Sequence, residues 1–109
     1  YGFSSRFEGQ KGSNPEELIG AAHAACFTMA LSLALNEAGF TADSLETSAK
    51  ISLEKLDTGF TVTASALTLT ATVPGIDDAT FQKVAAGAKA NCPISKLLKA
   101  DISLDGKLS

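Results

Sequence analysis

Two cysteines are the residues most able to do chemistry in this sequence. Cys26 ends the segment AAHAAC, and Cys92 lies in the segment ANCPIS. A cysteine within an apolar segment commonly packs as a small hydrophobic side chain. A nucleophilic role instead requires a thiolate, and an ordinary thiol with a pKa of about 8.5 is mostly protonated near neutral pH. A reactive Cys26 therefore needs a nearby cation, whereas a structural Cys26 does not.

Two residues could supply that cation. His23 lies one helical turn before Cys26 and could share its face of a helix. Arg6 is the single arginine of the sequence, and a guanidinium group keeps its proton at any physiological pH. A lone arginine can equally be an ordinary surface residue, so the residue types alone leave the role of Cys26 open.

Cys92 lies where a helix is expected to begin, because Asn91 and Pro93 flank it. Exposed N–H groups and the helix dipole lower the pKa of a thiol at such a position. Cys26 and Cys92 could form a peroxidatic and resolving pair if their Cα atoms come within about 7 Å; otherwise Cys92 is a helix-start residue without a role. With His23 they offer only three possible ligands, whereas structural zinc usually has four.

Length and composition indicate one globular domain. The chain has 109 residues, of which 45% are hydrophobic and 19% charged. A net charge of −3 and the lack of a basic patch disfavour nucleic acid or an anionic membrane as partner. The stretch 18–35 contains seven Ala or Gly residues, so we expect it to be too weakly apolar to span a membrane. With two distant cysteines and no visible signal peptide, we expect a cytoplasmic protein.

A long helix is expected to position Cys26. Ser13 or Asn14 can cap its start, Pro15 suits the first turn, and two acidic residues follow. The helix should run to about Ala38, where Gly39 supplies a stop. Apolar residues surround it for most of its length, so we expect it to be buried on nearly all sides.

The rest of the sequence predicts a sheet and two further helices. Alternating residues over 45–73, with a turn at 57–59, predict a hairpin. Its apolar phase slips at Ala66–Leu67, which indicates a β-bulge or a change of facing surface. Helices are expected over about 77–90 and 93–100, and a strand over 101–108. The fold class is α+β, a mostly antiparallel sheet packed on a long buried central helix.

The segments RFEGQKGSNPEELIGAAHAACF and ANCPISKLLKA together resemble the OsmC/Ohr family of osmotically inducible and organic-hydroperoxide-resistance proteins, and more closely its OsmC branch. The resemblance covers residues 1–109 as a single OsmC-like domain, with the family's N-terminal strands missing before Tyr1. It implies an OsmC-like fold that forms an intertwined homodimer with two sites at the interface.

The resemblance also implies an activity and a set of site residues. The activity is that of a cysteine-based peroxidase that reduces organic hydroperoxides to alcohols in oxidative and osmotic stress defence. Cys26 matches the peroxidatic cysteine and Cys92 the resolving cysteine, which would join in a disulfide. Arg6 matches the arginine of the OsmC branch, and Glu16 the glutamate that holds it. His23 is not carried over, because the Ohr branch typically has an aromatic residue there.

The expected reductant is an external dithiol, such as a lipoylated protein, and no bound cofactor is expected. Glu16 and Cys26 are ten residues apart on one helix, about 15 Å along its axis. A glutamate side chain does not span that distance, so either Arg6 bridges it or the Arg6–Glu16 pair serves Cys26 of the other subunit; we favour the second. The alternative function is a non-catalytic dimeric module that binds a hydrophobic ligand.

Overall fold

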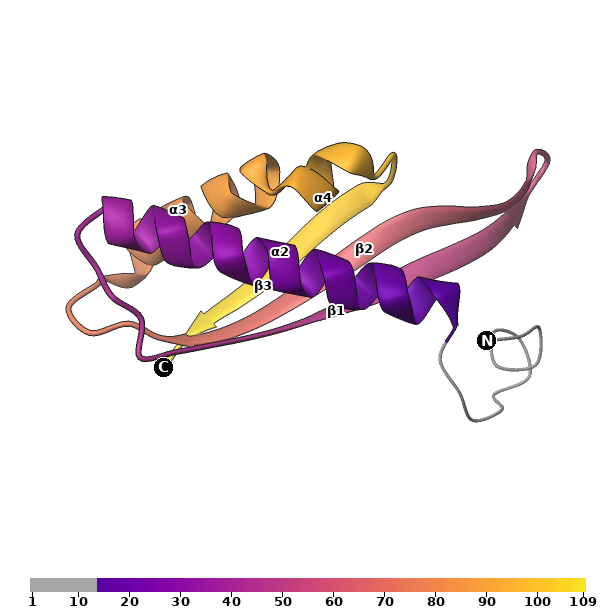
Figure 1. Cartoon of the computed structure of the whole chain (residues 1–109). Coiled ribbons are helices and arrows are strands. Elements are labelled where there is room, and N and C mark those ends of the chain that lie inside the picture. Colours follow the sequence, from indigo (N-terminus) through magenta and orange to yellow (C-terminus); the bar gives the residue numbers. More distant parts are fainter. Residues whose placement is uncertain (1–13) are drawn as a thin grey trace.

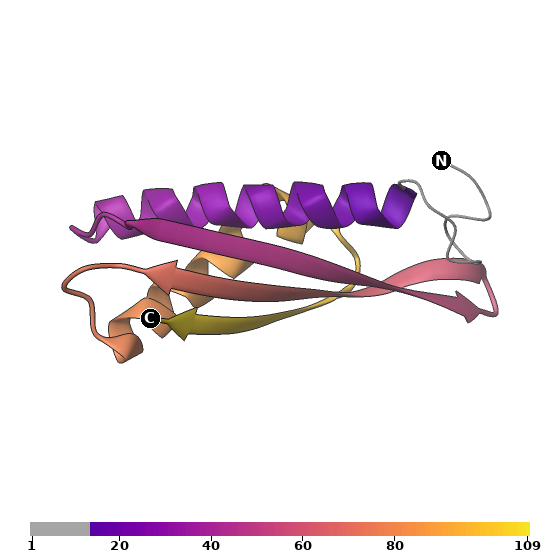
Figure 2. The same cartoon turned by 90° about the horizontal axis from the view of Figure 1, so that it is seen from below.

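The computed structural model describes residues 14–109, so the predicted role of Arg6 lies outside the described residues. The elements are α2 (Pro15–Glu37), β1 (Ser44–Leu56), β2 (Gly59–Thr72), α3 (Asp78–Asn91), α4 (Pro93–Leu97) and β3 (Asp101–Leu108). The three strands form one layer, and the helices cover one of its faces (Figures 1 and 2). Helix α2 packs on β1, and α3 packs on β3. The predicted α+β class is confirmed.

Local signals set both ends of α2, as expected. Asn14 is the N-cap, and its Oδ1 accepts a hydrogen bond from the Glu17 N–H at 2.9 Å. After Ala38, Gly39 takes a φ of +93°, a left-handed conformation that glycine adopts without the steric cost of a side chain. The helix therefore begins and ends where the sequence predicts.

Helix α2 is not buried all round in this chain. The buried side chains recur at helical spacing: Gly20, His23, Phe27, Leu31 and Leu35. The opposite side leaves Leu18, Met29 and Leu33 exposed by 48%, 74% and 60%. The expectation of burial on nearly all sides is wrong for the single chain, because the sheet covers one side, α3 and α4 cover a second, and no other described element covers the third.

Helix α2 also meets the length and hydropathy of a membrane span. Its mean hydropathy is 1.8, so the expectation that this stretch is too weakly apolar to span a membrane is wrong on composition. The central helix of a water-soluble fold passes the same test, and 33% of the apolar window of α2 is buried inside the chain. Among residues 14–109, one such helix is weak evidence for a membrane, since its buried stripe packs on the sheet.

The sheet has the order β1-β2-β3. Strands β1 and β2 are antiparallel and meet at a turn where Gly59 has a φ of +113°. Strand β3 pairs with β2 in parallel, after the crossover through α3 and α4. The longer of the two ladders is antiparallel, as predicted, and the parallel one brings α3 and α4 onto the face that α2 occupies.

The predicted bulge in the second strand is present, but it lies earlier than Ala66–Leu67. Ser52 pairs with Ala64 and Leu53 pairs with Val62, so Thr63 is the extra residue. The bulge switches the alternation of β2, which is why Val62 and Leu67 can face the same side although one position is even and the other odd. The apolar phase slip in the sequence marked this switch but did not fix its position.

Helix α3 begins at the predicted cap. The Oδ2 of Asp77 accepts a hydrogen bond from the Thr80 N–H at 3.2 Å. Phe81, Ala85 and Ala88 are its buried residues. Helix α4 is shorter than expected and ends at Leu97, because Leu98 turns to an extended conformation that leads into β3.

We predict that Gly20→Ala destabilises the protein. A Cβ at this position would lie 3.0 Å from the Ala49 carbonyl oxygen and 3.3 Å from Ile51 Cγ1. Overpacking of this kind costs about 1–3 kcal/mol, which exceeds the roughly 1 kcal/mol that alanine gains over glycine in a helix. Urea denaturation should show a loss of about 1 kcal/mol in unfolding free energy.

The matched control is Ser32→Ala, an exposed position on the same helix. It changes only local helix propensity, so the unfolding free energy should rise by no more than about 0.5 kcal/mol. A Gly20→Ala protein as stable as this control would show that α2 does not depend on close approach to β1.

Candidate active site

The structure brings Cys26 and Cys92 together from different helices. Cys26 lies on the side of α2 that faces α4, and it is partly buried. Cys92 lies at the junction of α3 and α4 and is fully buried. Both are free thiols, and they lie close enough for each to shift the pKa of the other. The structure therefore places the two cysteines close together, while their pairing in a disulfide stays a prediction.

Pro93 explains why the chain breaks at Cys92. A residue that precedes proline is disfavoured in helical conformation, and Cys92 has φ −58° and ψ 127°. Its N–H still donates to the Ala88 carbonyl at 2.9 Å, which ties it to the end of α3. Proline then starts α4, so the sulfur is held between two helices and beside the first turn of the second.

The pKa of Cys26 is raised above the ordinary value for a thiol. Burial is the largest cause, and the hydrogen bond with Cys92 adds to it. The Ile94 N–H acts in the opposite direction but does not outweigh them. Within residues 14–109, the surroundings therefore keep Cys26 protonated at neutral pH.

The pKa of Cys92 is lowered instead. Burial acts to raise it, but the hydrogen bond from the Cys26 thiol and the N–H and hydroxyl of Ser95 outweigh burial. The sulfur makes no short capping hydrogen bond to α4, so the effect comes from several weaker donors together. The lowered pKa at a helix start agrees with the expectation from sequence.

His23 does not supply the cation that Cys26 needs. Its ring is fully buried, and burial lowers its pKa, so the imidazole is neutral at pH 7. Its Nδ1 lies 2.6 Å from Ser65 Oγ and its Nε2 lies 2.8 Å from Ser95 Oγ. The possibility that His23 activates Cys26 as a cation is therefore excluded by its environment.

Ser65 and Ser95 are site residues that the sequence reasoning missed. Ser65 is fully buried among the apolar residues of β2, and Ser95 lies on α4. Ser95 is the fourth residue of the segment CPIS. With Cys92 as the N-cap of α4, Ser95 is at N3, a position close to the N-cap side chain. That spacing is the one local signal that could have identified it.

Glu16 is not brought to the two thiols. It lies in the first turn of α2 and lines a hollow beside β1 with Lys50 and Ile51, whereas Cys26 lines a different groove. In one chain, the structure therefore separates Glu16 from Cys26, as the length of the helix requires.

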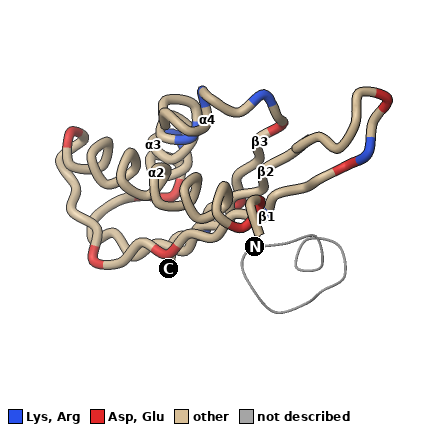
Figure 3. The backbone as a smooth tube through the Cα atoms, turned by 45° about the vertical axis from the view of Figure 1, so that its right-hand side comes forward, with Lys and Arg blue, Asp and Glu red and all other residues tan. Residues whose placement is uncertain are grey.

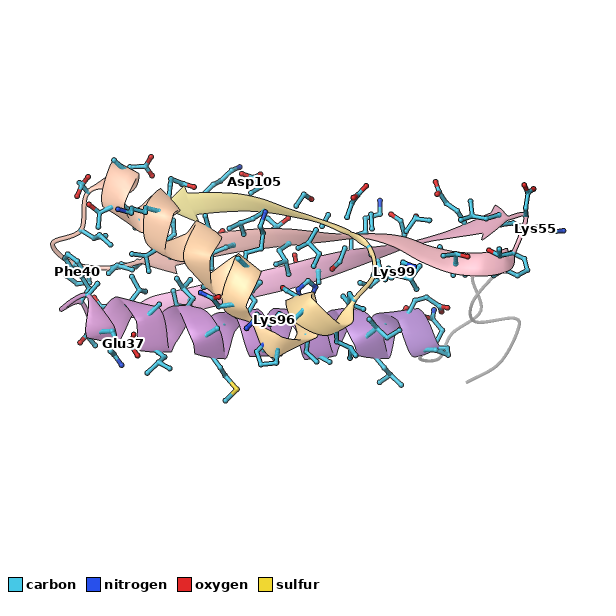
Figure 4. The ribbon with its side chains drawn as sticks, turned by 90° about the horizontal axis from the view of Figure 1, so that it is seen from above. Glu37, Phe40, Lys55, Lys96, Lys99 and Asp105 are labelled. Carbon is cyan, nitrogen blue, oxygen red and sulfur yellow. The ribbon has the colours of Figure 1, made fainter. Side chains whose placement is uncertain are left out.

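Cys26 opens onto a mostly apolar groove of about 1200 Å³ between α2 and the α3–α4 pair. Helix α2 carries no charge between Glu17 and Glu37, and charged residues mark the hairpin tip (Figure 3). Figure 4 shows α3 and α4 beside α2, with Glu37 at one end of α2 and Lys96 on α4. The apolar residues that line the groove include Ala22, Ala25, Met29, Ala30, Leu33, Val84 and Ile94.

In the part of the chain that the structure describes, no three His, Cys, Asp or Glu side chains form a group that could hold a metal ion. The described residues around Cys26 offer a pair of thiols, a neutral imidazole and two hydroxyl groups.

Comparison with known proteins places this geometry in a family. The family model described as OsmC-like protein matches residues 8–106. The chain is 61% identical over 108 residues to peroxiredoxin OsmC of Escherichia coli, which covers 99% of this chain and 76% of that protein. It is 30% identical over 102 residues to organic hydroperoxide resistance protein OhrB of Bacillus subtilis, covering 93% and 73%.

Solved structures agree with the fold. The crystal structure of an organic hydroperoxide resistance protein OsmC from Legionella pneumophila matches with a TM-score of 0.75 and 26% identity, covering 94% of this chain and 76% of that one. The B. subtilis OhrB crystal structure matches with a TM-score of 0.69 and 31% identity, covering 94% and 74%. The chain belongs to the OsmC-like family, and the higher identity to OsmC than to OhrB supports the OsmC branch.

Proposed function

We propose that this protein is a cysteine-based peroxidase that reduces organic hydroperoxides through a Cys26 sulfenic acid and a Cys26–Cys92 disulfide. The observation that carries the proposal is the adjacent pair of free thiols, one open to an apolar groove and the other fully buried. Family membership supports a thiol-dependent peroxidase active in peroxide defence, because two relatives are named peroxiredoxin and organic hydroperoxide resistance protein.

Access decides which thiol reacts first. Cys92 has the lower pKa, but none of its surface is exposed, whereas Cys26 lines the groove. A peroxide must touch the sulfur that it oxidises, so we assign the peroxidatic role to Cys26. Its raised pKa requires a cation to stabilise the thiolate, and Arg6 is proposed to supply it, held by Glu16.

The proposed cycle has three steps. The Cys26 thiolate attacks one peroxide oxygen, the O–O bond breaks, and the alkoxide takes a proton and leaves as alcohol. The Cys92 sulfur attacks the Cys26 sulfenic acid, an S–S bond forms, and hydroxide leaves as water with the proton from Cys92. An external dithiol then restores both thiols and becomes a disulfide itself, so no bound cofactor is needed; a lipoylated protein is the proposed donor.

The apolar lining of the groove favours an organic hydroperoxide as substrate. An alkyl or aryl hydroperoxide would bury its apolar part against side chains such as Ala22, Met29 and Leu33, while hydrogen peroxide gains nothing from them. The same exposed side chains support the proposed homodimer, because Leu18, Met29 and Leu33 form an uncovered apolar side of α2 that a second copy would bury.

We predict that cumene hydroperoxide consumes both thiols of the reduced protein and forms one intramolecular disulfide. The proximity of Cys26 and Cys92 allows condensation without a large rearrangement. Free-thiol counting and non-reducing peptide mapping would measure this result. Thiols that remain unreacted would instead favour the alternative, a non-catalytic dimeric module that binds a hydrophobic ligand in the groove.

Cys92→Ser should keep the first turnover but lose cycling. Without a resolving thiol, Cys26 sulfenic acid would accumulate and be oxidised further to sulfinic acid, which mass spectrometry detects. The control is Cys26→Ser, which should lose the first turnover itself. If Cys92→Ser cycles normally with a dithiol, Cys92 is not the resolving residue.

Mixing Cys26→Ser subunits with Glu16→Ala subunits tests whether the site is shared between copies. The mixed dimer would contain one complete site if Glu16 of one subunit serves Cys26 of the other. Peroxidase activity should then exceed that of either parent variant. Equal activity of the mixture and the parents, with mixed dimers verified by mass spectrometry, would refute sharing.

A further inference from the structure

We propose that His23 is a positioning residue that directs the Ser95 hydroxyl at Cys92 and so prepares Cys92 as the thiolate that resolves the sulfenic acid. The inference rests on the proposed function, because it assigns a role within the second step of the cycle. Its structural basis is a line of contacts that crosses the molecule: Ser65, His23, Ser95, Cys92 and Cys26.

The contacts in this line connect β2, α2 and α4. Ser65 lies on β2, His23 on α2, Ser95 on α4 and Cys92 at the start of α4. Both ring nitrogens of His23 face serine oxygens, at 2.6 Å and 2.8 Å. Ser65 and His23 are fully buried, so neither group exchanges its partner for water. The imidazole is therefore held from the sheet side by Ser65 and acts on Ser95 from the other side.

The network has one arrangement that suits a thiolate at Cys92. A neutral imidazole has one N–H donor and one acceptor nitrogen. When Ser65 donates to Nδ1, Nε2–H donates to Ser95 Oγ, and the Ser95 hydroxyl proton is then free to donate to the Cys92 sulfur. When Cys92 is a thiol, the hydrogen bonds can run in the opposite direction: Ser95 donates to Nε2 and Nδ1–H donates to Ser65. Both ring nitrogens of His23 then still have a partner.

Ser95 would not adopt this orientation without His23. A serine inside a helix commonly turns its hydroxyl back to the carbonyl of the preceding turn. When Nε2–H donates to Ser95 Oγ, the serine oxygen acts as an acceptor. The hydroxyl proton of Ser95 can then point toward Cys92. His23 thus acts through Ser95 and does not itself touch the reacting sulfur.

Within residues 14–109, the groups that shift the pKa of Cys92 are uncharged, and Arg6 lies outside the described residues. The charged residues closest in sequence to Cys92 are Lys89 on α3 and Lys96 on α4. The Nζ of Lys89 donates to the Ile102 carbonyl at 3.4 Å, and Lys96 is exposed. On α2, Cys26 lies beside Cys92, and His23 contacts Ser95.

The first test follows the thiolate of Cys92 directly by its ultraviolet absorbance in a Cys26→Ser background. Ser95→Ala should raise the pKa of Cys92 by about one unit, since hydrogen bonds to a charged group are among the stronger ones. His23→Phe should raise it in the same direction. Ser95→Thr keeps the hydroxyl and should retain the original pKa. An unchanged pKa in Ser95→Ala would overturn the proposal, even if His23→Phe fails to fold.

The second test measures how fast the disulfide forms after a single equivalent of hydroperoxide, across pH. In Ser95→Ala the pH midpoint of this step should move upward, because a higher pKa leaves less thiolate at each lower pH. Adding His23→Phe to Ser95→Ala should move the midpoint no further, since His23 acts through Ser95. A further shift in the double variant would show that His23 acts by another route.

Thr28→Val is the matched control. Thr28 Oγ1 donates to Thr47 Oγ1 at 2.7 Å, which is another hydroxyl contact between α2 and the sheet but has no link to a thiol. This variant should leave both pH midpoints in place, so a shift there would mean that general loosening of α2 explains the effect. Absence of any disulfide in the unmodified protein would refute the proposed function, whereas normal disulfide formation with unshifted variants would refute only the role of His23.

Discussion

The packing of α2 against the sheet is the contact on which the candidate site depends. Gly20 brings the helix close to Ala49, and Phe27 and Leu31 fill the space further along. Neighbouring helical residues differ by about 100° around the axis. Because Phe27 faces the sheet, Cys26 faces sideways toward α4, where Cys92 lies. A helix rotated by one position would bury Cys26 against the strands and separate the two sulfurs.

Local signals predicted a large part of this arrangement. Asn14 capped the long helix as expected, and Asn91–Pro93 correctly marked a helix break at Cys92. Such signals involve residues within one helical turn of each other, so the sequence displays them directly. The partners of His23 could not be found this way, because they lie 42 and 72 residues away and meet it only after the helices pack on the sheet.

Two predictions made from the sequence were wrong for the same physical reason. The bulge was expected at Ala66–Leu67 but lies at Thr63, and α2 was expected to be buried all round but leaves Met29 exposed. The position of the bulge and the burial of α2 both depend on which surfaces pack together. The periodicity of the sequence shows only which positions are apolar. An apolar helix of this kind has more hydrophobic surface than one chain covers, and the proposed homodimer would cover the remaining side.

The two thiols divide the requirements of a peroxidase between them. Reaction with a peroxide needs both access and a thiolate, and the fold gives access to Cys26 but lowers the pKa of Cys92. Two thiols that shift each other's pKa titrate as a pair, so a cation brought to Cys26 would shift the shared proton toward Cys92. Once Cys26 is a sulfenic acid, it no longer competes for thiolate character, and Ser95 again favours the anion at Cys92. In the proposed cycle, the position of a single proton between the two sulfurs therefore orders oxidation before resolution.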